Sequence, residues 1–114
     1  MISWMATHEQ AIIHSFIQVF KSVCNANDSL FVDSGANEAS FSLMAAAFGC
    51  EVLAIEPQPL CVSWIEQFVN ANSFGRKVKI IESFLGPNTS HQHKVPLNSC
   101  KGTFQGIANS DRTE

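Results

Sequence analysis

Apolar side chains along this chain follow two spacings, and the alternation of the two predicts the fold. Three segments carry apolar residues every three or four positions, as one face of a helix does. Three shorter segments are continuous apolar runs, which is typical of strands buried inside a sheet. In chain order, the sequence predicts a helix at 7–24, a strand at 29–33, a helix at 39–48, a strand at 51–56, a helix opened by Pro57 and Pro59, and a strand at 78–81.

Strands that are separated by whole helices pair in parallel through right-handed crossovers. We therefore expect an α/β fold, a partial doubly wound (Rossmann-like) and mostly parallel sheet of three core strands with flanking helices. The first helix should bury a stripe of Ile12, Phe16, Val19 and Val23, widened by Ile13 and Phe20. The aromatic core should contain Phe16, Phe20, Phe31, Phe41, Phe48 and Phe68.

The composition changes near residue 87. Residues 1–87 are dense in periodic apolar positions, whereas residues 88–114 are rich in Asn, Ser, Thr, His, Gly and Lys. We expect a Rossmann-like cofactor-binding region over 1–87, followed by a polar tail over 88–114 that is either disordered or forms a short hairpin around residues 102–108. His91 and His93 form a pair without a third ligand at a fixed spacing, so we expect solvated histidines and no metal site.

Composition and charge exclude several classes of protein. The chain has 114 residues, of which 46% are hydrophobic and 15% charged, and this balance argues against disorder. A net charge of −3 provides no footprint for nucleic acid. No apolar run approaches the length of a membrane helix.

The N-terminal residues and the cysteines bear on the compartment. Met1–Met5 lack the basic and apolar regions of a signal peptide, so we expect a cytoplasmic protein. Cys24, Cys50, Cys61 and Cys100 are widely spaced, and in that compartment we expect them to be free, buried thiols. Two disulfides are the alternative, and they would need oxidising surroundings.

Two acids fall where the first and second strands end. Such a sheet binds ligands at the carboxyl ends of its strands. Gly35 lets the turn after Asp33 tighten and lets a ligand approach the backbone. The helix that follows directs free N–H groups at the same crevice. Glu56, about 20 residues further on, can accept hydrogen bonds from both hydroxyls of a ribose.

Two cofactors carry such a ribose, NAD and S-adenosylmethionine. The dinucleotide fingerprint G-x-G-x-x-G would need glycines where Asn37 and Ser40 stand. Asp33 would also repel a pyrophosphate. It would stabilise the ammonium and sulfonium groups of S-adenosylmethionine, so charge favours that cofactor.

Leu30–Leu43 resembles the first motif of class I methyltransferases, and its form D-x-G-A-N-x-x-x-F-S is similar to that of the FkbM-type enzymes. Val52–Pro59, with Glu-Pro-Gln-Pro, resembles the second motif of that family. Val78–Gly86 resembles the third strand and the turn that follows it. The resemblance covers residues 29–87, and the motifs stand in the family's order and spacing.

The resemblance implies a role for each matching residue. Asp33 and Gly35 would hold the methionine end of S-adenosylmethionine, with Asn37 in the same loop. Glu56 would hold the ribose, and Ser83 and Phe84 would lie near the adenine. The family usually has Gly where this chain has Ala39, and the extra methyl group would crowd the loop.

Each of three residues also has a purely structural interpretation. Asp33 could cap the helix that follows it, Glu56 could be an exposed acid at a strand end, and Gly35 could serve a tight turn alone. The sequence identifies no catalytic residue, because the acceptor half of such enzymes comes from the fourth strand onward.

The function expected from these residues is S-adenosylmethionine-dependent methyl transfer by a truncated, FkbM-like chain, with O-methylation of a small-molecule or sugar acceptor. The alternatives are a non-catalytic cofactor-binding or interaction module and an NAD-binding oxidoreductase fragment. We expect no nucleic-acid or membrane partner. The third strand should lie at an unpaired sheet edge, which favours a homodimer or a partner chain that covers it.

Overall fold

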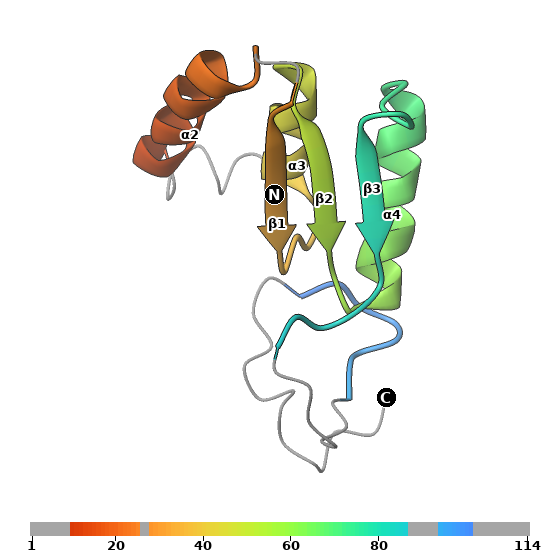
Figure 1. Cartoon of the computed structure of the whole chain (residues 1–114). Helices are drawn as coiled ribbons and strands as arrows, with labels where there is room; N and C mark the ends of the chain where they lie inside the picture. Colours follow the sequence, from red (N-terminus) through yellow and green to blue (C-terminus); the bar gives the residue numbers. More distant parts are fainter. Residues whose placement is uncertain (1–9, 26–27, 87–93, 102–114) are drawn as a thin grey trace.

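The structure is a computed structural model that describes residues 10–25, 28–86 and 94–101. Its elements, in chain order, are α2 (Gln10–Val23), β1 (Leu30–Ser34), α3 (Ser40–Ala47), β2 (Glu51–Ile55), α4 (Pro59–Ala71) and β3 (Val78–Ile81). The strands form one sheet in the order β1-β2-β3, and both neighbouring pairs are parallel (Figure 1). The expected α/β, Rossmann-like sheet with flanking helices is confirmed.

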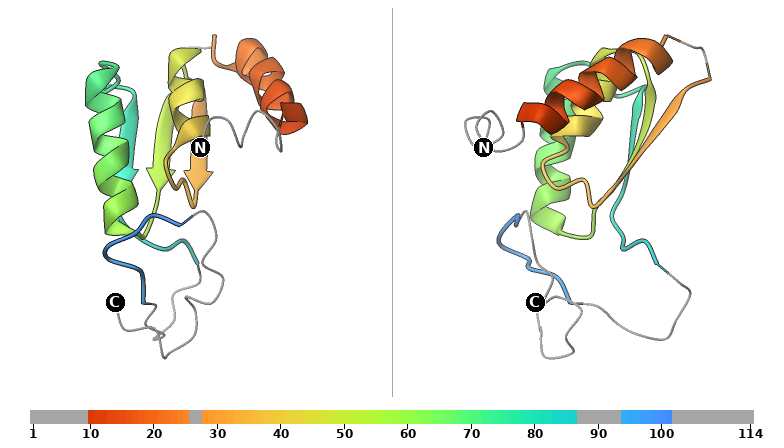
Figure 2. Two further views of the ribbon diagram at one scale, coloured as in Figure 1. Left: turned by 180° about the vertical axis from the view of Figure 1, so that it is seen from behind. Right: turned by 90° about the vertical axis from the view of Figure 1, so that its left-hand side faces the viewer.

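The helices gather on one face of the sheet, as Figure 2 shows from behind and from the side. Helix α3 packs on β1 and β2, α4 packs on β3, and α2 packs on α3. Along β1 the exposure alternates, because successive side chains of a strand point to opposite faces. Phe31 points to the helices, whereas Leu30 and Val32 are 62% and 47% exposed on the opposite face. Within the described ranges, no helix covers that second face.

Phenylalanine rings join α2 to the sheet and to α3. Phe20 is 1% exposed, and its ring meets that of Phe31 edge-on at 5.1 Å between centroids. Phe16 lies 4.5 Å from Phe41 in the same cluster. The prediction of Phe68 in the core is wrong: this side chain is 41% exposed, because Ile65 and Val69 form the buried face of α4.

The buried face of α2 is rotated from the predicted stripe. Ile12, Val19 and Val23 were expected inside, but they are 48%, 52% and 44% exposed. Phe20 was also expected inside and is buried, Phe16 is half-buried, and Cys24, the residue after the helix, is buried as well. The aromatic contacts to β1 and α3 decide the rotation, since a helix with apolar residues on more than one side can turn either way toward a partner.

The cysteines correct a second prediction. Cys24, which follows α2, forms a disulfide with Cys50, which precedes β2. Cys61 and Cys100 form another, and the described residues include no free cysteine. The expectation of free, buried thiols is therefore wrong. The four positions are far apart in sequence, and only the folded chain brings each pair within bonding distance.

Some of the predictions concern residues that the structure does not describe. The compositional change at residue 87, the His91 and His93 pair, and the hairpin expected around residues 102–108 lie outside the described residues.

None of the described helices is long and apolar enough to cross a membrane. Strand β3 pairs with β2 alone among the described strands, as expected, and β1 forms the opposite edge.

Candidate functional site

The turn after β1 and the end of β2 meet at the carboxyl edge of the sheet. Backbone N–H groups of Gly35 and Ala36 both donate to the carbonyl oxygen of Ile55, at 2.8 and 3.1 Å. The N–H of Asn37 donates to Glu56 Oε1 at 2.8 Å. These bonds bring Gly35, Asn37 and Glu56 together, at the edge where the sequence predicted a ligand crevice.

The turn has an unusual backbone. Gly35, Asn37 and Ala39 have φ values of 71°, 57° and 62°, in the left-handed region that side chains other than glycine rarely adopt. A Cβ atom at Gly35 would meet no protein atom within 4 Å, so the space above its backbone is open. Ala39 is 1% exposed, and its methyl group lies in the core rather than in that open space. The glycine therefore leaves room for a ligand to approach the turn.

Glu56 lies at the centre of this edge and is fully buried, with 0% of its surface exposed. Its Oε1 accepts from Asn37, and its Oε2 accepts from the backbone N–H of Gln58 at 2.9 Å and from Gln58 Nε2 at 3.2 Å. A buried carboxyl group needs such donors to offset the loss of water. The alternative of an exposed strand-end acid is wrong, since the side chain lies inside a hydrogen-bonded cluster.

Asp33 points toward α3. Its Oδ2 accepts from Ser42 Oγ at 2.6 Å, and the Ser42 backbone also donates to its carboxylate. Because Ala39 at the start of α3 offers no side-chain cap, Asp33 takes that role, in line with the structural interpretation. Burial raises the pKa of Asp33, the charge of Glu56 adds to the rise, and the bonds from Ser42 oppose it.

Ser83 and Phe84 follow β3, whose last residue, Ile81, pairs with Ile55 at the same edge of the sheet. Figure 1 shows the chain leaving β3 at this edge. Ser83 is exposed, and its Oγ donates to the carbonyl oxygen of Phe84 at 3.0 Å. Contact of these two residues with an adenine ring stays a prediction.

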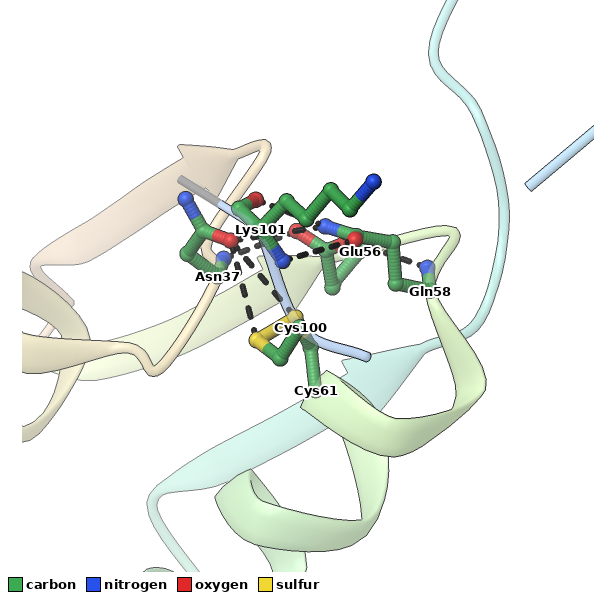
Figure 3. The surroundings of a disulfide bond; sticks show 6 residues. All are labelled: Asn37, Glu56, Gln58, Cys61, Cys100 and Lys101. Carbon is green, nitrogen blue, oxygen red and sulfur yellow. Dashed lines mark hydrogen bonds between the residues drawn. A yellow bond between two sulfur atoms is a disulfide. The ribbon is translucent and has the colours of Figure 1, made fainter. Parts of the chain in front are cut away.

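A segment from near the end of the chain, Lys94–Lys101, lies across this edge, and we call it the strap. The Cys61–Cys100 disulfide ties the strap to the first turn of α4 (Figure 3). The Lys101 N–H donates to Gln58 Oε1 at 2.9 Å, and Gln58 Nε2 donates to the Lys101 carbonyl oxygen at 3.0 Å. Gln58 is 0% exposed beneath these contacts.

The disulfide itself adjoins the predicted site. Asn37 Oδ1 lies 3.5 Å from Cys61 Sγ and 3.7 Å from Cys100 Sγ. The sulfur atoms of a disulfide carry no hydrogen, so these are packing contacts and not hydrogen bonds. Asn37 thus touches both Glu56 and the bond that holds the strap.

Sequence reasoning missed four residues of this site, Gln58, Cys61, Cys100 and Lys101. Two signals for them were available: an even number of cysteines, and a polar side chain between the two prolines of Glu-Pro-Gln-Pro. Lys101 carried no signal, because it contributes its backbone.

The Gly35 turn and the Glu56 cluster differ in their fit to an S-adenosylmethionine molecule. The Gly35 turn fits, because the space above its backbone is open. The Glu56 carboxyl group is covered by Gln58, which bonds to the strap, so a ribose cannot reach it in this arrangement. Among the residues that the structure describes, no three His, Cys, Asp or Glu side chains form a group suited to a metal ion.

Comparison with known proteins supports the fold. No family model matches the chain, and no curated protein matches it. Among solved structures, the crystal structure of PRMT6 matches with a TM-score of 0.51 and 20% identity, over 59% of this chain and 20% of that one. A precorrin-6y C5,15-methyltransferase from Geobacter metallireducens matches with a TM-score of 0.45 and 24% identity, over 59% of this chain and 37% of that one.

The matched part of this chain therefore spans about a fifth of PRMT6 and little more than a third of the precorrin enzyme. At this identity, the likeness concerns the fold. The fold is a Rossmann-like α/β sheet, similar to part of the crystal structure of PRMT6.

Proposed function

We propose that the chain is a methyltransferase-like domain that binds S-adenosylmethionine at the carboxyl edge of β1 and β2. The observation that carries this proposal is the meeting of an open, left-handed Gly35 turn with the Glu56 carboxyl group through Asn37. A glycine turn followed by a helix suits the cofactor's carboxylate, and an acid at the next strand end suits its ribose.

Each residue has a definite task in this proposal. Gly35 admits the cofactor to the backbone, and those N–H groups at the start of α3 that Asp33 does not cap receive its carboxylate. Glu56 accepts hydrogen bonds from the ribose hydroxyls once it is uncovered, and Asp33 holds the start of α3 in place through Ser42. When bound, the cofactor supplies a methyl group on a sulfonium, and the chain contributes orientation of the reactants.

The finer assignment rests on the motif resemblance. We propose an FkbM-like enzyme that methylates an oxygen atom of a small molecule or sugar. The matched part of this chain corresponds to a minor part of each methyltransferase compared above. We therefore propose that the residues that bind this acceptor, and any general base, lie outside the matched part. This chain then represents the cofactor half of the activity.

The test is calorimetric titration of the chain with S-adenosylmethionine and, separately, with NAD, before and after reduction of its disulfides. We expect saturable binding of S-adenosylmethionine and none of NAD. Gly35→Ala should weaken binding, because its methyl group enters the space that the ligand needs. Gly75→Ala is the control for a methyl group added in open space away from the turn, since a Cβ atom there also meets nothing within 4 Å; it lacks the positive φ of Gly35, so the strain of Gly35→Ala is measured separately by thermal melting. Saturable NAD binding without S-adenosylmethionine binding would refute the proposal.

The two disulfides support a proposal about the compartment of the chain. Structural disulfides persist in oxidising surroundings and are rare in the cytosol. Two of them in one short chain weigh against the cytoplasmic location that the N-terminal residues suggested. We therefore infer that the chain matures in an oxidising compartment. Alkylation of free thiols in intact cells, followed by mass spectrometry, tests this, and four alkylated cysteines would contradict it.

An interaction module is the second candidate function, and the uncovered face of the sheet favours it. A groove on that face is lined by residues that include Leu30, Leu53, Lys79 and Ile81. Parallel sheets are normally covered on both faces. We infer that a second copy or a partner chain covers the face and a sheet edge. Light scattering after size exclusion tests the homodimer, and a stable monomer that resists aggregation would contradict both forms of cover.

A further inference from the structure

The strap is held by a disulfide, Cys61–Cys100, that lies close to the buried acid Glu56. We propose that the Cys61–Cys100 disulfide is a redox latch that holds residues 94–101 over Glu56, and that its reduction by a dithiol opens the crevice. The proposal rests on the proposed function for the identity of the ligand alone. The opening of the crevice is a property of this chain that can be measured without any ligand.

The contacts of the strap show why the disulfide controls access. Glu56 and Gln58 are each 0% exposed, and the strap meets Gln58 through the N–H and carbonyl groups of Lys101. Individual hydrogen bonds of this kind contribute little net free energy, because water replaces them. Besides the disulfide, these two bonds and the burial of Pro96 hold the strap, in which Leu97 is 51% exposed. The disulfide is therefore the covalent hold among the described contacts of the strap.

The latch disulfide is also the more reachable of the two. Cys24 and Cys50 are 3% and 2% exposed, whereas Cys100 is half-buried and Cys61 is 0% exposed. Of the four cysteines, Cys100 is therefore the one most open to an attacking thiolate. Cys61 then leaves as a thiolate in the first turn of α4, where the helix N-terminus stabilises negative charge.

The reaction is thiol–disulfide exchange and balances with the dithiol alone. The first sulfur of the dithiol bonds to Cys100 Sγ, and the bond between Cys100 and Cys61 breaks. The second sulfur attacks the first, which releases Cys100 and leaves the dithiol as a disulfide. Two electrons and two protons pass from the dithiol to the two cysteines.

The reduced form has a hydrogen bond that the oxidised form lacks. The Cys61 thiol, once protonated, has Asn37 Oδ1 within 3.5 Å as an acceptor. Asn37 also donates its backbone N–H to Glu56. The latch is thus in contact with the turn that forms the other wall of the crevice.

Carbodiimide-driven amidation of carboxyl groups, read by peptide mass spectrometry, measures access to Glu56 directly. The full chain is labelled in the oxidised form and after treatment with a small dithiol. We expect the rate at Glu56 to rise at least about tenfold on reduction, as for a local opening equilibrium shifted by the loss of a tether. Exposed Glu82 serves as the internal reference and should label at one rate in both forms. An unchanged rate at Glu56 would overturn the latch.

Cysteine variants distinguish the effect of reducing the Cys61–Cys100 disulfide from the effect of reducing the Cys24–Cys50 disulfide. Cys61→Ser/Cys100→Ser should label at Glu56 as fast without dithiol as the reduced protein does. Cys24→Ser/Cys50→Ser keeps the latch and should stay slow until dithiol is added. Circular dichroism will show whether this second pair of substitutions unfolds the chain. In that case, the labelling rate of Cys61→Ser/Cys100→Ser with and without dithiol still tests the latch. Fast labelling in a folded Cys24→Ser/Cys50→Ser protein without dithiol would contradict the proposal.

Titration with S-adenosylmethionine distinguishes this proposal from the function on which its ligand rests. Faster labelling together with binding to the reduced form alone supports both. Faster labelling with no binding in either form refutes the proposed function and supports the latch. Equal labelling refutes the latch, whatever the titration shows.

Discussion

The two disulfides lie at opposite ends of the same parallel sheet, and they have different structural roles. Cys24–Cys50 joins the end of α2 to the start of β2, and both residues are buried in the core. Cys61–Cys100 joins α4 to the strap at the carboxyl ends of the strands, and Cys100 is half-buried. One bond joins two cysteines that are both buried in the core, whereas the other holds an irregular segment against a polar cluster.

The packing at the two ends of the sheet explains the different roles of the two disulfides. At the amino end, Gly49 adopts a φ of 107°, and a Cβ atom there would lie 3.0 Å from the carbonyl oxygen of Cys24. At the carboxyl end, the space above Gly35 is open. The amino end is packed for stability, and the carboxyl end keeps room for a ligand. A sheet of this class binds its ligands at the carboxyl end, and the packing follows that division.

The largest expected effect comes from removing the amino-end disulfide. Cys24→Ser/Cys50→Ser should lower the free energy of unfolding by about 3 kcal/mol, because the unfolded chain regains the entropy of an open loop. Cys61→Ser/Cys100→Ser opens a longer loop, with a sequence separation of 39 against 26. It should nevertheless cost less, because the strap can leave while the sheet stays folded. Urea denaturation measures both, and a larger loss at the strap would reverse the comparison.

Loss of an acceptor inside the Glu56 cluster should have the next largest effect. Glu56→Gln turns an amide N–H₂ group toward Asn37 or Gln58, which already donate, and we expect a cost of about 2 kcal/mol. Glu82→Gln, at an exposed position after β3, is the matched control and should change stability by less than about 0.5 kcal/mol. Denaturant titration gives both values. Equal effects of the two substitutions would show that the buried hydrogen bonds contribute nothing.

Two glycines test the packing at the two ends directly. Gly49→Ala should destabilise the chain by about 1–2 kcal/mol, since its methyl group meets both an unfavourable φ and the Cys24 carbonyl. Gly35→Ala should cost about 1 kcal/mol from its φ alone. Thermal melting with Gly75→Ala as the reference checks the order. A Gly35→Ala protein less stable than Gly49→Ala would mean that the crevice is as tightly packed as the core.

The smallest effect concerns pH. Because burial raises the pKa of Asp33 above its ordinary value of 3.8, the folded chain binds more protons than the unfolded chain between 3.8 and the raised pKa. The contribution of Asp33 to the free energy of unfolding is therefore fully present below pH 3.8 and is lost as the pH rises through the folded pKa. Asp33→Asn should flatten this decline while its amide oxygen still accepts from Ser42.

Denaturation curves at a series of pH values above and below 3.8 measure the slope. Ser42→Ala provides the opposite control: it removes a hydrogen bond that lowers the pKa of Asp33, so the decline should extend to higher pH. Identical slopes for the wild-type chain and Asp33→Asn would contradict the assignment.

Local patterns predicted the elements well and their contacts less well. The three strands fall within a residue of the predicted runs, because a buried strand needs a continuous apolar segment. The rotation of α2 and the exposure of Phe68 were missed, since each depends on which neighbouring side chains fill the space. The pairing of the cysteines was missed for the same reason: the spacing along the chain does not show which residues meet.

The candidate site divides in the same way. Glycine at position 35 and acids at the ends of two strands were visible in the sequence, and their spacing predicted a common edge for Gly35 and Glu56. The motif resemblance placed Asn37 in the same loop. The turning of Asp33 toward Ser42, the burial of Glu56 and the strap across Gln58 were decided by the tertiary structure. Period and turn chemistry are properties of neighbouring residues. Burial and the Cys61–Cys100 bond depend on segments that are distant in sequence and meet when the chain folds.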